Sequence, residues 1–491
     1  MNNKIIGITC DKETEFNKWY TELVIKCKLI AYTDVSGCYV LLPQSYHFWN
    51  EIKKMLETEF INMDIKNAYF PLFITQNNLK KEKDHVEGFS PEVAYVTKTG
   101  SHELEEENYL IVRPTSECCI YPVYKNLITT YKDLPLKYNQ FCNVVRWEFK
   151  DTMPFIRSRE FLWSEIHNCF TNMNDSIQDV NNIMNLYENI FFELLALPTI
   201  RGTKTNLEKF NGGISTSTLE CIIPNNGKGI QACTSHYLGT NFSSVYDIVY
   251  RDNDNNFKNV HQTCHGITTR TIGISIMTHS DNKGLVVSPN IAEIQVIIIP
   301  IYPKNKELHD TIDKYCKKIY DKLGYFRCKI DNDKTHTVGY KFNHYELHGI
   351  PLRLEIGINE YNNNQIILHR RDNNIKTVCN IDNIKTFIKI NIVNMHQNMY
   401  DKALTNVLNT IIFSNNVNDF CNNIKNNKVN ICNWCNTDSC EKYIKENYQV
   451  KTLCILDTYF NKSLIEKVIH NDECMFCSNK NQVICLFGKT Y

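Results

Sequence analysis

Charged and aromatic side chains alternate along one stretch of the sequence. Every second residue between positions 157 and 167 belongs to this set: Arg157, Arg159, Phe161, Trp163, Glu165 and His167. Alternate residues of a β-strand project from one face. With Arg146 and Glu148 on an adjacent strand, they would form one face of an antiparallel hairpin. This density of guanidinium, carboxylate and aromatic groups indicates a site for an anionic ligand beside a small cationic one.

The manner of phosphate binding is limited by what the sequence lacks. It contains neither a glycine-rich dinucleotide fingerprint nor a P-loop. A nucleotide would therefore lie on a sheet, held by arginine forks and not by a helix N-terminus. The alternative for any isolated pair of surface arginines is ordinary solvation or pairing with carboxylates.

Four cysteines near the end of the sequence have the spacing of a metal site. Cys435 and Cys440 are separated by four residues, and Cys474 and Cys477 by two. Four thiolates in two close pairs suit a tetrahedral structural Zn²⁺. Reduced thiols without a metal are the alternative, and three further cysteines leave the choice of ligands open: Cys432, Cys454 and Cys485. His344 and His348 are four residues apart, but with no third ligand nearby we favour an ordinary histidine pair.

Composition limits the class of protein. The 491 residues predict about three domains, and 43% apolar with 22% charged residues is typical of a globular chain. Lys plus Arg and Asp plus Glu both total 54, so nucleic-acid binding would require local basic clusters. The 21 cysteines are odd in number and mostly scattered, which favours reduced thiols in the cytoplasm over a secreted disulfide framework.

No targeting or membrane segment is expected. Residues 1–9 lack the pattern of a signal peptide. The most apolar run, 291–301, is interrupted by Glu293 and Gln295 and is too short to cross a bilayer. We interpret it as a buried strand and expect no membrane partner.

Periodicity and breakers predict the elements that position these groups. Helices are expected at 13–30, 46–61, 175–195, 306–323 and 394–409. Strands are expected at 68–70, 110–113, 142–149, 155–167, 215–223, 229–238, 295–299, 327–330 and 351–356, with 268–279 running from strand into helix. From residue 291 the alternation of strand and helix predicts a compact α/β unit.

Several motifs resemble the class II aminoacyl-tRNA synthetases. Residues 145–149 (VRWEF) and 157–163 (RSREFLW) resemble their motif 2. Residues 113–117 (RPTSE), 231–236 (QACTSH) and 268–273 (TTRTIG) resemble prolyl-tRNA synthetase of the archaeal and eukaryotic type. The resemblance covers residues 16–491. Residues 67–71 resemble motif 1, which builds the dimer interface in this class and implies a homodimer.

The resemblance implies roles in binding ATP. Arg146 would bridge the α-phosphate and the proline carboxylate, and Arg270 of motif 3 would hold the γ-phosphate; both are expected to be catalytic. Arg157 would hold the outer phosphates, and Glu148 would accept from the adenine amino group. Three further residues would contact ATP, the first of them beside a Mg²⁺ ion: Gln231, Thr234 and Thr268. Mg²⁺ is expected because it prefers phosphate ligands.

The resemblance also implies a proline site. Thr115 and Glu117 would receive the secondary ammonium, whose two donors need a hydroxyl and a carboxylate. Four more side chains, besides Arg146, would shape the pocket: Phe161, Trp163, His167 and His236. Without the resemblance, hydrogen-bonded core histidines would be the favoured interpretation of the last two.

The implied fold class is α+β, in three parts. Residues 1–290 would form the class II catalytic domain, an antiparallel sheet with helices. Residues 291–395 would form an α/β anticodon-binding domain, and residues 396–491 a small α+β C-terminal domain with a zinc site at Cys435, Cys440, Cys474 and Cys477. The last residues resemble the family's terminus, which docks near the active site.

Two features of the sequence bear on how selectively proline would be recognised. The interval between His167 and His265 leaves no room for an editing domain, so we expect no editing in cis. Such editing matters because a missing methylene is worth only about 1–3 kcal/mol in a pocket. Cys264-His265-Gly266 stands where the family usually has Ser-Trp-Gly, next to the proline pocket.

The resemblance therefore implies a cytoplasmic enzyme that activates L-proline with ATP and transfers it to the 3′ end of tRNA(Pro). Two alternatives remain: a silent paralogue that only binds tRNA or another partner, and a class II ligase for another amino acid. Proline-dependent ATP–pyrophosphate exchange distinguishes the three.

Overall fold

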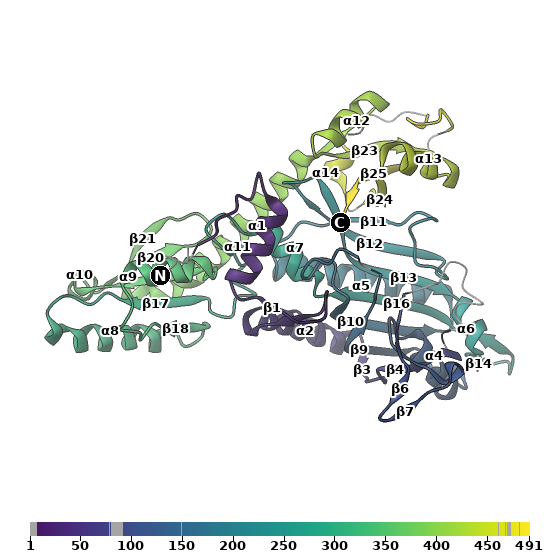
Figure 1. The fold of residues 1–491 in the computed structure, drawn as a ribbon, viewed down its shortest axis with the longest axis horizontal. Coiled ribbons are helices and arrows are strands. Elements are labelled where there is room, and N and C mark those ends of the chain that lie inside the picture. Colours follow the sequence, from purple (N-terminus) through teal and green to yellow (C-terminus); the bar gives the residue numbers. More distant parts are fainter. Residues whose placement is uncertain are drawn as a thin grey trace.

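The computed structural model describes residues 7–77, 79, 92–148, 150–459, 461–466, 468, 473–480 and 482–491 (Figure 1). Within these residues the largest sheet has eleven strands. In spatial order they are β22 (Ile411–Phe413), β23 (Val429–Trp434), β25 (Val483–Thr490), β24 (Lys451–Leu456), β11 (Ile200–Thr203), β12 (Ser215–Ile223), β13 (Lys228–Gly239), β16 (His261–Thr268), β10 (Glu160–Phe170), β9 (Leu136–Val145) and β3 (Lys66–Asn67). Neighbours are antiparallel except β22/β23 and β9/β3, and β25 also pairs in parallel with the start of β13.

Helices cover one face of this sheet and leave room for a site on the other. On the first face lie α1 (Phe16–Lys26), α2 (Pro43–Asn62), α5 (Met173–Glu193) and α7 (Arg270–His279). Helix α5 begins at the cap Asn172, whose side chain accepts from the backbone N–H of Asp175, and packs against β10, β12, β13 and β16. On the other face lie α4 (Glu117–Leu127) and α6 (Asn241–Tyr246).

A second sheet of five strands lies beside the first (Figure 1, left). Its order is β18 (Cys328–Ile330), β17 (Val296–Pro300), β19 (Leu352–Ile356), β20 (Gln365–Arg370) and β21 (Lys376–Asn380), with helices α8 (His309–Lys322), α9 (Val338–Leu347) and α10 (Ile358–Asn362). Strand β17 is parallel to both its neighbours and buried throughout, as expected for the apolar run at 291–301. Helix α11 (Ile384–Thr410) then runs from this unit to the tail, where α12 (Val417–Lys425), α13 (Asp438–Tyr448) and α14 (Lys462–Ile465) lie.

The remaining strands form small ribbons. These are β1 (Ile30–Tyr32) with β2 (Tyr39–Leu41), β4 (Phe73–Thr75) with β8 (Leu110–Val112) and β5 (Ala94–Val96), β6 (Lys98–Thr99) with β7 (His102–Glu103), and β14 (Val249–Arg251) with β15 (Phe257–Asn259). Single 3₁₀ turns span Glu106–Asn108, Tyr131–Asp133, Lys306–Leu308 and Ile381–Asn383. No helix within the described ranges is long and apolar enough to cross a membrane.

The hairpin differs from its prediction at both ends. Strand β9 begins at Leu136 and ends at Val145, so Arg146 and Glu148 follow the strand; Phe149 lies outside the described residues. Strand β10 begins only at Glu160, because Phe155 has a φ of 63° and the Arg157 N–H donates to the Met153 carbonyl, closing a turn. The prediction that 155–159 belongs to the strand was wrong.

Other predicted boundaries also moved. The expected strand at 68–70 is wrong: pairing ends at Asn67, and the Phe70 N–H bonds the Gln140 side chain. Helix α1 ends at Lys26, and Ile30 begins a strand. Helix α11 starts ten residues before the expected position 394, at Ile384.

The tail strands extend the large sheet. Strand β24 pairs with β11 through Gly202–Leu456 and Thr203–Ile455, and β25 pairs with β13 through Lys228–Lys489. A Cβ at Gly202 would collide with the Ile455 carbonyl and lie 2.7 Å from the Cys454 Sγ, so only glycine allows this approach. One continuous sheet therefore joins the tail to the strands of the candidate site.

Candidate active site

A cavity of about 240 Å³ opens on the helix-poor face of the large sheet. Predicted site residues that line it are Thr115, Glu117, Arg146, Phe161, Trp163, Gln231, Thr234, His236, Thr268 and Arg270. A second cavity of about 220 Å³ shares Gln231 and Arg270 with the first, and Arg157 and Tyr491 line it too. The two cavities are therefore adjacent, and a ligand with several phosphates could lie next to a smaller one.

Strand register explains the grouping. His167 on β10, Cys264 on β16 and His236 on β13 are direct neighbours across three strands. One step along, Glu165 and Thr234 flank Gly266 in the same way. Since cross-strand neighbours share a face, residues far apart in the sequence form two adjacent rows on the cavity floor.

Two predicted residues lie outside the cavities. His167 is fully buried beneath the first cavity, where its Nδ1 meets the Tyr121 hydroxyl at 3.0 Å. Glu148 is exposed and lines neither of the two. Glu148 lies just beyond the end of β9 at Val145, and no hydrogen bond or ion pair joins its side chain to another described residue.

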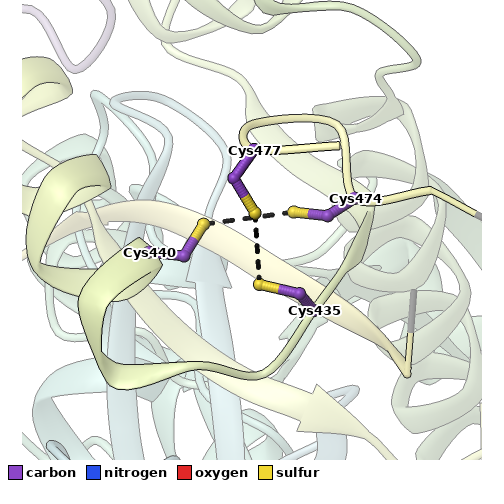
Figure 2. Close-up of side chains that lie close together, drawn as sticks. All are labelled: Cys435, Cys440, Cys474 and Cys477. Atoms are coloured by element: carbon purple, nitrogen blue, oxygen red, sulfur yellow. Dashed lines mark hydrogen bonds between the residues drawn. The ribbon is translucent and has the colours of Figure 1, made fainter. Parts of the chain in front are cut away.

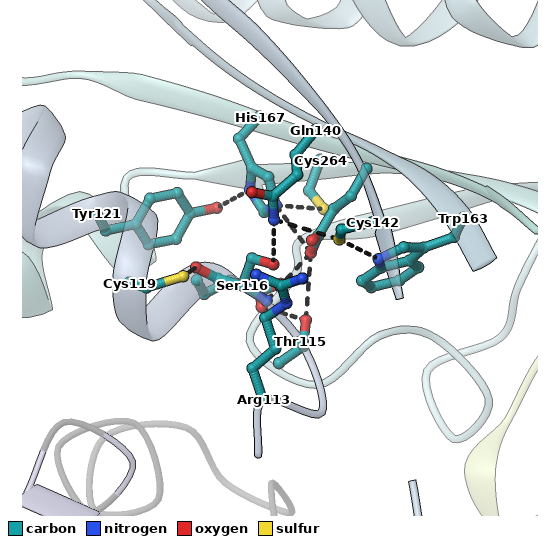
Figure 3. A network of polar contacts seen from close by, with 12 residues as sticks. Arg113, Thr115, Ser116, Cys119, Tyr121, Gln140, Cys142, Trp163, His167 and Cys264 are labelled. Carbon is teal, nitrogen blue, oxygen red and sulfur yellow. Dashed lines mark hydrogen bonds and ion pairs between the residues drawn. The ribbon is translucent and has the colours of Figure 1, made fainter. Parts of the chain in front are cut away.

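Buried carboxylates lie at one end of the cavity. They belong to a polar network in which Figure 3 labels Thr115, Ser116 and His167. Thr115 donates to Glu117 through a short hydrogen bond, and the Ser116 N–H donates to Glu165 at 3.3 Å. Glu165 Oε1 lies 2.9 Å from Nε2 of His167. This end therefore presents hydroxyl and carboxylate oxygens, which suits a small cation with two N–H donors.

The pKa values of Glu117 and Glu165 are shifted in opposite directions. Burial and the neighbouring Glu165 raise the pKa of Glu117. Burial alone would raise the pKa of Glu165 too, but the charge and hydrogen bond of His167 lower it. For His167 burial opposes the charged form, yet Cys264 and Glu165 hold its pKa well above the usual range. Glu165 and His167 thus form an ion pair, and Glu117 keeps the proton-accepting position next to the cavity.

Guanidinium groups lie at the other end. Arg146 donates from Nε to the Pro114 carbonyl at 2.9 Å, and its guanidinium carbon lies 5.4 Å from the centre of the Trp163 ring. Arg270 donates to the Gln231 carbonyl at 3.1 Å, and burial lowers its pKa to about 10. It stays charged at neutral pH. Both side chains have donors left over for an anion.

An aromatic wall closes the side of the cavity. Its rings are those of Phe161, Trp163, Phe210 and His236. His236 Nδ1 lies 2.8 Å from the Thr216 hydroxyl, and burial lowers its pKa to about 3. A neutral imidazole tilted against the Phe210 ring, with ring centres 4.8 Å apart, gives an uncharged surface suited to an aliphatic ring.

Sequence reasoning missed some of these residues. Period-two alternation already placed Glu165 beside Trp163 and His167, but it was not chosen as a site residue. Phe210 and Thr216 come from a loop and a neighbouring strand with no distinctive motif. Cys264 was noted only as a departure from a family pattern.

The two unusual residues of β16 face opposite ways. Cys264 lies on the cavity side, 3.8 Å from His167 Nε2. His265 projects to the helix side, where its ring bonds Ser235 at 2.6 Å and Asp179 at 2.9 Å. Of these two side chains, only that of Cys264 can touch a ligand near His167.

The four tail cysteines form one cluster (Figure 2). Their sulfur atoms lie within 4.8 Å of one another, with 4.0 Å between Cys440 and Cys474 and 3.6 Å between Cys435 and Cys477. A hydrogen bond from Cys440 lowers the pKa of Cys474 to about 4. Four converging sulfur atoms fit a tetrahedral Zn²⁺. The other four tail cysteines lie outside this cluster: Cys421, Cys432, Cys454 and Cys485.

Two adjacent arginines at the end of β20 already have carboxylate partners. Arg370 bonds Asp372 at 2.7 Å, and buried Arg371 bonds Asp281 of the preceding segment at 2.6 Å. Arg371 therefore joins the two parts of the chain. The rings of His344 and His348 are tilted by 54° with centres 4.5 Å apart, and the metal-ligand groups found within the described residues do not include them.

Comparisons with known proteins agree with this geometry. Residues 96–279 match a family described as tRNA synthetase class II core domain (G, H, P, S and T), residues 295–391 an anticodon binding domain, and residues 417–491 the C-terminal domain of prolyl-tRNA synthetase. A proline–tRNA ligase of Borreliella burgdorferi is 38% identical, with 98% of this chain and 99% of that protein covered.

Two crystal structures of prolyl-tRNA synthetase from Cryptosporidium parvum are similar throughout. The complex with halofuginone and AMPPNP has a TM-score of 0.93 at 39% identity, covering 100% of this chain and 98% of that one. The complex with L-proline and AMP has a TM-score of 0.90 at 38% identity, covering 99% and 100%.

Proposed function

The chain belongs to the prolyl-tRNA synthetase family, and from that premise we propose which of its side chains carry each step. As a class II proline–tRNA ligase, it joins L-proline to ATP as prolyl-adenylate, releases pyrophosphate, and transfers the prolyl group to tRNA. The observation that supports the residue roles is the cavity with carboxylates at one end and guanidinium groups at the other.

Proline binds at the carboxylate end. Its secondary ammonium donates to Thr115 and Glu117, while Glu165 and His167 support Glu117 from below. The ring lies against Phe161, Trp163 and His236, whose neutral imidazole adds no charge to an apolar contact. Arg146 receives the proline carboxylate, because it is the cation nearest Trp163 in the cavity lining.

ATP binds along the two joined cavities. Arg146 holds the α-phosphate, Arg157 the outer phosphates and Arg270 the γ-phosphate, while Thr234 and Thr268 contact the nucleotide. Glu148 accepts from the adenine amino group after a local rearrangement, since it is exposed next to the hairpin. The proline carboxylate oxygen attacks the α-phosphorus, and the bond to the β,γ-diphosphate breaks in line.

Arg146 and Arg270 are the catalytic side chains. Negative charge spreads over the phosphoryl oxygens in the transition state, and fixed guanidinium groups lower its energy without reorganisation. Oxygen donors of Gln231 and Glu220 line the second cavity and suit Mg²⁺, which would screen the phosphates when bound. No protein side chain is needed as a base for the second step, in which the adenylate phosphate accepts the proton of the tRNA ribose hydroxyl.

The remaining assignments are part of the same proposal. Cys435, Cys440, Cys474 and Cys477 hold a structural Zn²⁺. The divisions at residues 290 and 395 are supported by the matches of residues 295–391 and 417–491 to two separate domain families, while α11 (Ile384–Thr410) runs unbroken across residue 395. The residues between β10 and β16 form α5, α6 and β11–β15 packed on the sheet, which supports the absence of editing in cis.

Assembly and location are inferred from surface and thiols. Strand β3 lies at the sheet edge, and the Tyr69 side chain that follows it is 74% exposed, which supports a homodimer formed through this region. No disulfide joins cysteines within the described residues, which supports a cytoplasmic location.

The test is ATP–pyrophosphate exchange with each amino acid in turn, followed by charging of tRNA(Pro). Exchange that depends on proline, with charging of tRNA(Pro) alone, supports the proposal. Exchange with another amino acid would indicate a different ligase, and no exchange at all a silent paralogue. Loss of alanine from mischarged tRNA(Pro) in the presence of this enzyme alone would contradict the absence of editing.

A further inference from the structure

A second group of side chains that could bind a metal ion lies at the carboxylate end of the cavity. Glu117, Glu165, His167 and Cys264 bring one ligand atom each within 4.8 Å of the others. All four side chains are buried, with exposed fractions of 2%, 1%, 0% and 7% respectively. They come from α4, β10 and β16, so the packed sheet holds them together.

His167 directs Nε2 into the cluster, where the ring now forms an ion pair with Glu165. Its Nδ1 is occupied by the Tyr121 hydroxyl at 3.0 Å, which fixes the ring and directs Nε2 toward the cluster. Nε2 lies 2.9 Å from Glu165 Oε1 and 3.8 Å from Cys264 Sγ. Ligand atoms around a tetrahedral Zn²⁺, bound at about 2.0–2.3 Å, are spaced by about 3.3–3.7 Å. Small side-chain movements would therefore complete a coordination shell.

One oxygen in the cluster has no partner. Glu165 Oε2 is buried, and no described residue forms a hydrogen bond with it. A buried carboxylate oxygen without a donor is costly, so its position indicates a missing cation or donor. The cavity also contains Arg146, but this guanidinium donates to the Pro114 carbonyl and lies over the Trp163 ring.

We propose that this pocket binds a thiophilic divalent cation of the Zn²⁺ type through Glu117, Glu165, His167 and Cys264, and that the cation and the substrate ammonium exclude one another. The exclusion rests on the proposed function, which places proline against Glu117. Thiol and imidazole ligands favour Zn²⁺ or Co²⁺ over Mg²⁺, which prefers oxygen. Metal binding releases two protons to solvent, one from the Cys264 thiol and one from Nε2 of His167, and leaves a thiolate and a neutral imidazole as ligands.

The test uses Co²⁺ as a spectroscopic probe. The full-length protein is first loaded with one equivalent of Zn²⁺ per tail cluster and then titrated with Co²⁺. We expect a thiolate-to-cobalt absorption band in the wild type and in Cys142→Ser, because Cys142 is a neighbouring thiol outside the cluster. In Cys264→Ser we expect the band to be lost and the affinity for Co²⁺ to fall about tenfold or more. A band that persists in Cys264→Ser, or none in the wild type, would overturn the proposal.

Competition provides a measurement on the wild type alone. Proline should abolish the cobalt band, and Co²⁺ should raise the apparent Kd for proline while leaving that for ATP unchanged. Simultaneous binding of proline and Co²⁺ would refute the exclusion. Absence of proline-dependent exchange would instead refute the proposed function, since the cobalt band requires neither ATP nor catalysis.

Discussion

Glu165 and His167 lie two residues apart on β10, with 2.9 Å between Oε1 and Nε2, both buried below the amino-acid end of the cavity. Their ion pair lowers the pKa of Glu165 and raises that of His167, whereas burial and the charge of Glu165 raise the pKa of Glu117. Glu117, the carboxylate that we propose as the acceptor of the proline ammonium, is therefore protonated more easily than Glu165.

The first prediction concerns pH. Because the pKa of Glu117 is raised, the pocket takes up a proton above the ordinary glutamate value of about 4.3, and the neutral acid no longer attracts the proline ammonium. kcat/KM for proline should fall by about tenfold per pH unit below this apparent pKa, at saturating ATP. The measurement is the exchange rate at subsaturating proline across pH. A profile unchanged down to the ordinary glutamate pKa, with the protein still folded, would contradict it.

The second prediction concerns Arg146. Arg146→Ala should lower kcat/KM for proline-dependent exchange by about 3–4 kcal/mol in transition-state free energy, because a charge-assisted phosphate contact disappears. The matched control is Arg159→Ala on the same hairpin. Its guanidinium stacks 4.5 Å from the Trp147 ring and donates to the Ser36 carbonyl, away from the cavity lining. Equal losses in both variants would show that the effect is structural.

The third prediction concerns the hydroxyl of Thr115. Thr115→Val keeps the shape but removes the donor to Glu117 and one acceptor for the proline ammonium. KM for proline should rise by about tenfold, equivalent to about 1–2 kcal/mol, with KM for ATP unchanged. Steady-state exchange kinetics with each substrate varied in turn measures both. A selective rise in KM for ATP would place this residue elsewhere.

The fourth prediction concerns the tail metal. Cys440→Ser should remove the zinc content and lower the midpoint of thermal unfolding, because bound metal stabilises only the folded state. Zinc analysis and calorimetry measure these two quantities. Cys421→Ser is the control, since Cys421 lies on α12 of the same tail but outside the cluster. Full zinc content in Cys440→Ser would refute the assignment.

The fifth prediction concerns the seam between β11 and β24. Gly202→Ala would force a Cβ against the Ile455 carbonyl and should destabilise the protein by about 2–4 kcal/mol. Gly339→Ala on α9, where an added Cβ meets nothing within 4 Å, should leave stability unchanged or slightly raised. The difference in melting temperature between these two variants is the measurement. Equal melting temperatures would show that β11 and β24 can move apart at Gly202 without loss of stability.

The prolyl-tRNA synthetase family and the three-part organisation could be predicted from the sequence, because both are recognised from long motifs. Period-two alternation also placed Trp163, Glu165 and His167 on one face, as β10 confirms. The pattern failed at 155–159, where a positive φ at Phe155 turns the chain. Alternation reports side-chain polarity and contains no information about such a local backbone reversal.

The pairing of strands that are distant in the sequence could not be predicted, for a different reason. The neighbours of His167 are set by register among β10, β16 and β13, and the pairing of β24 with β11 joins residues some 250 positions apart. Register depends on which faces pack together in the whole sheet. Phe210 and Thr216 entered the cavity lining by this route, without a local signal.

The pairing of β24 with β11 also bears on shortened forms of the chain. If the tail were removed, the backbone amides and carbonyls of β11 would become an open edge next to the apolar residues Ile200, Ile222 and Val407, which now lie in one cluster with the tail. Exposed edges of this kind pair with other molecules. A protein shortened before β22 should therefore precipitate as aggregates instead of surviving as a dissolved, weakly active enzyme.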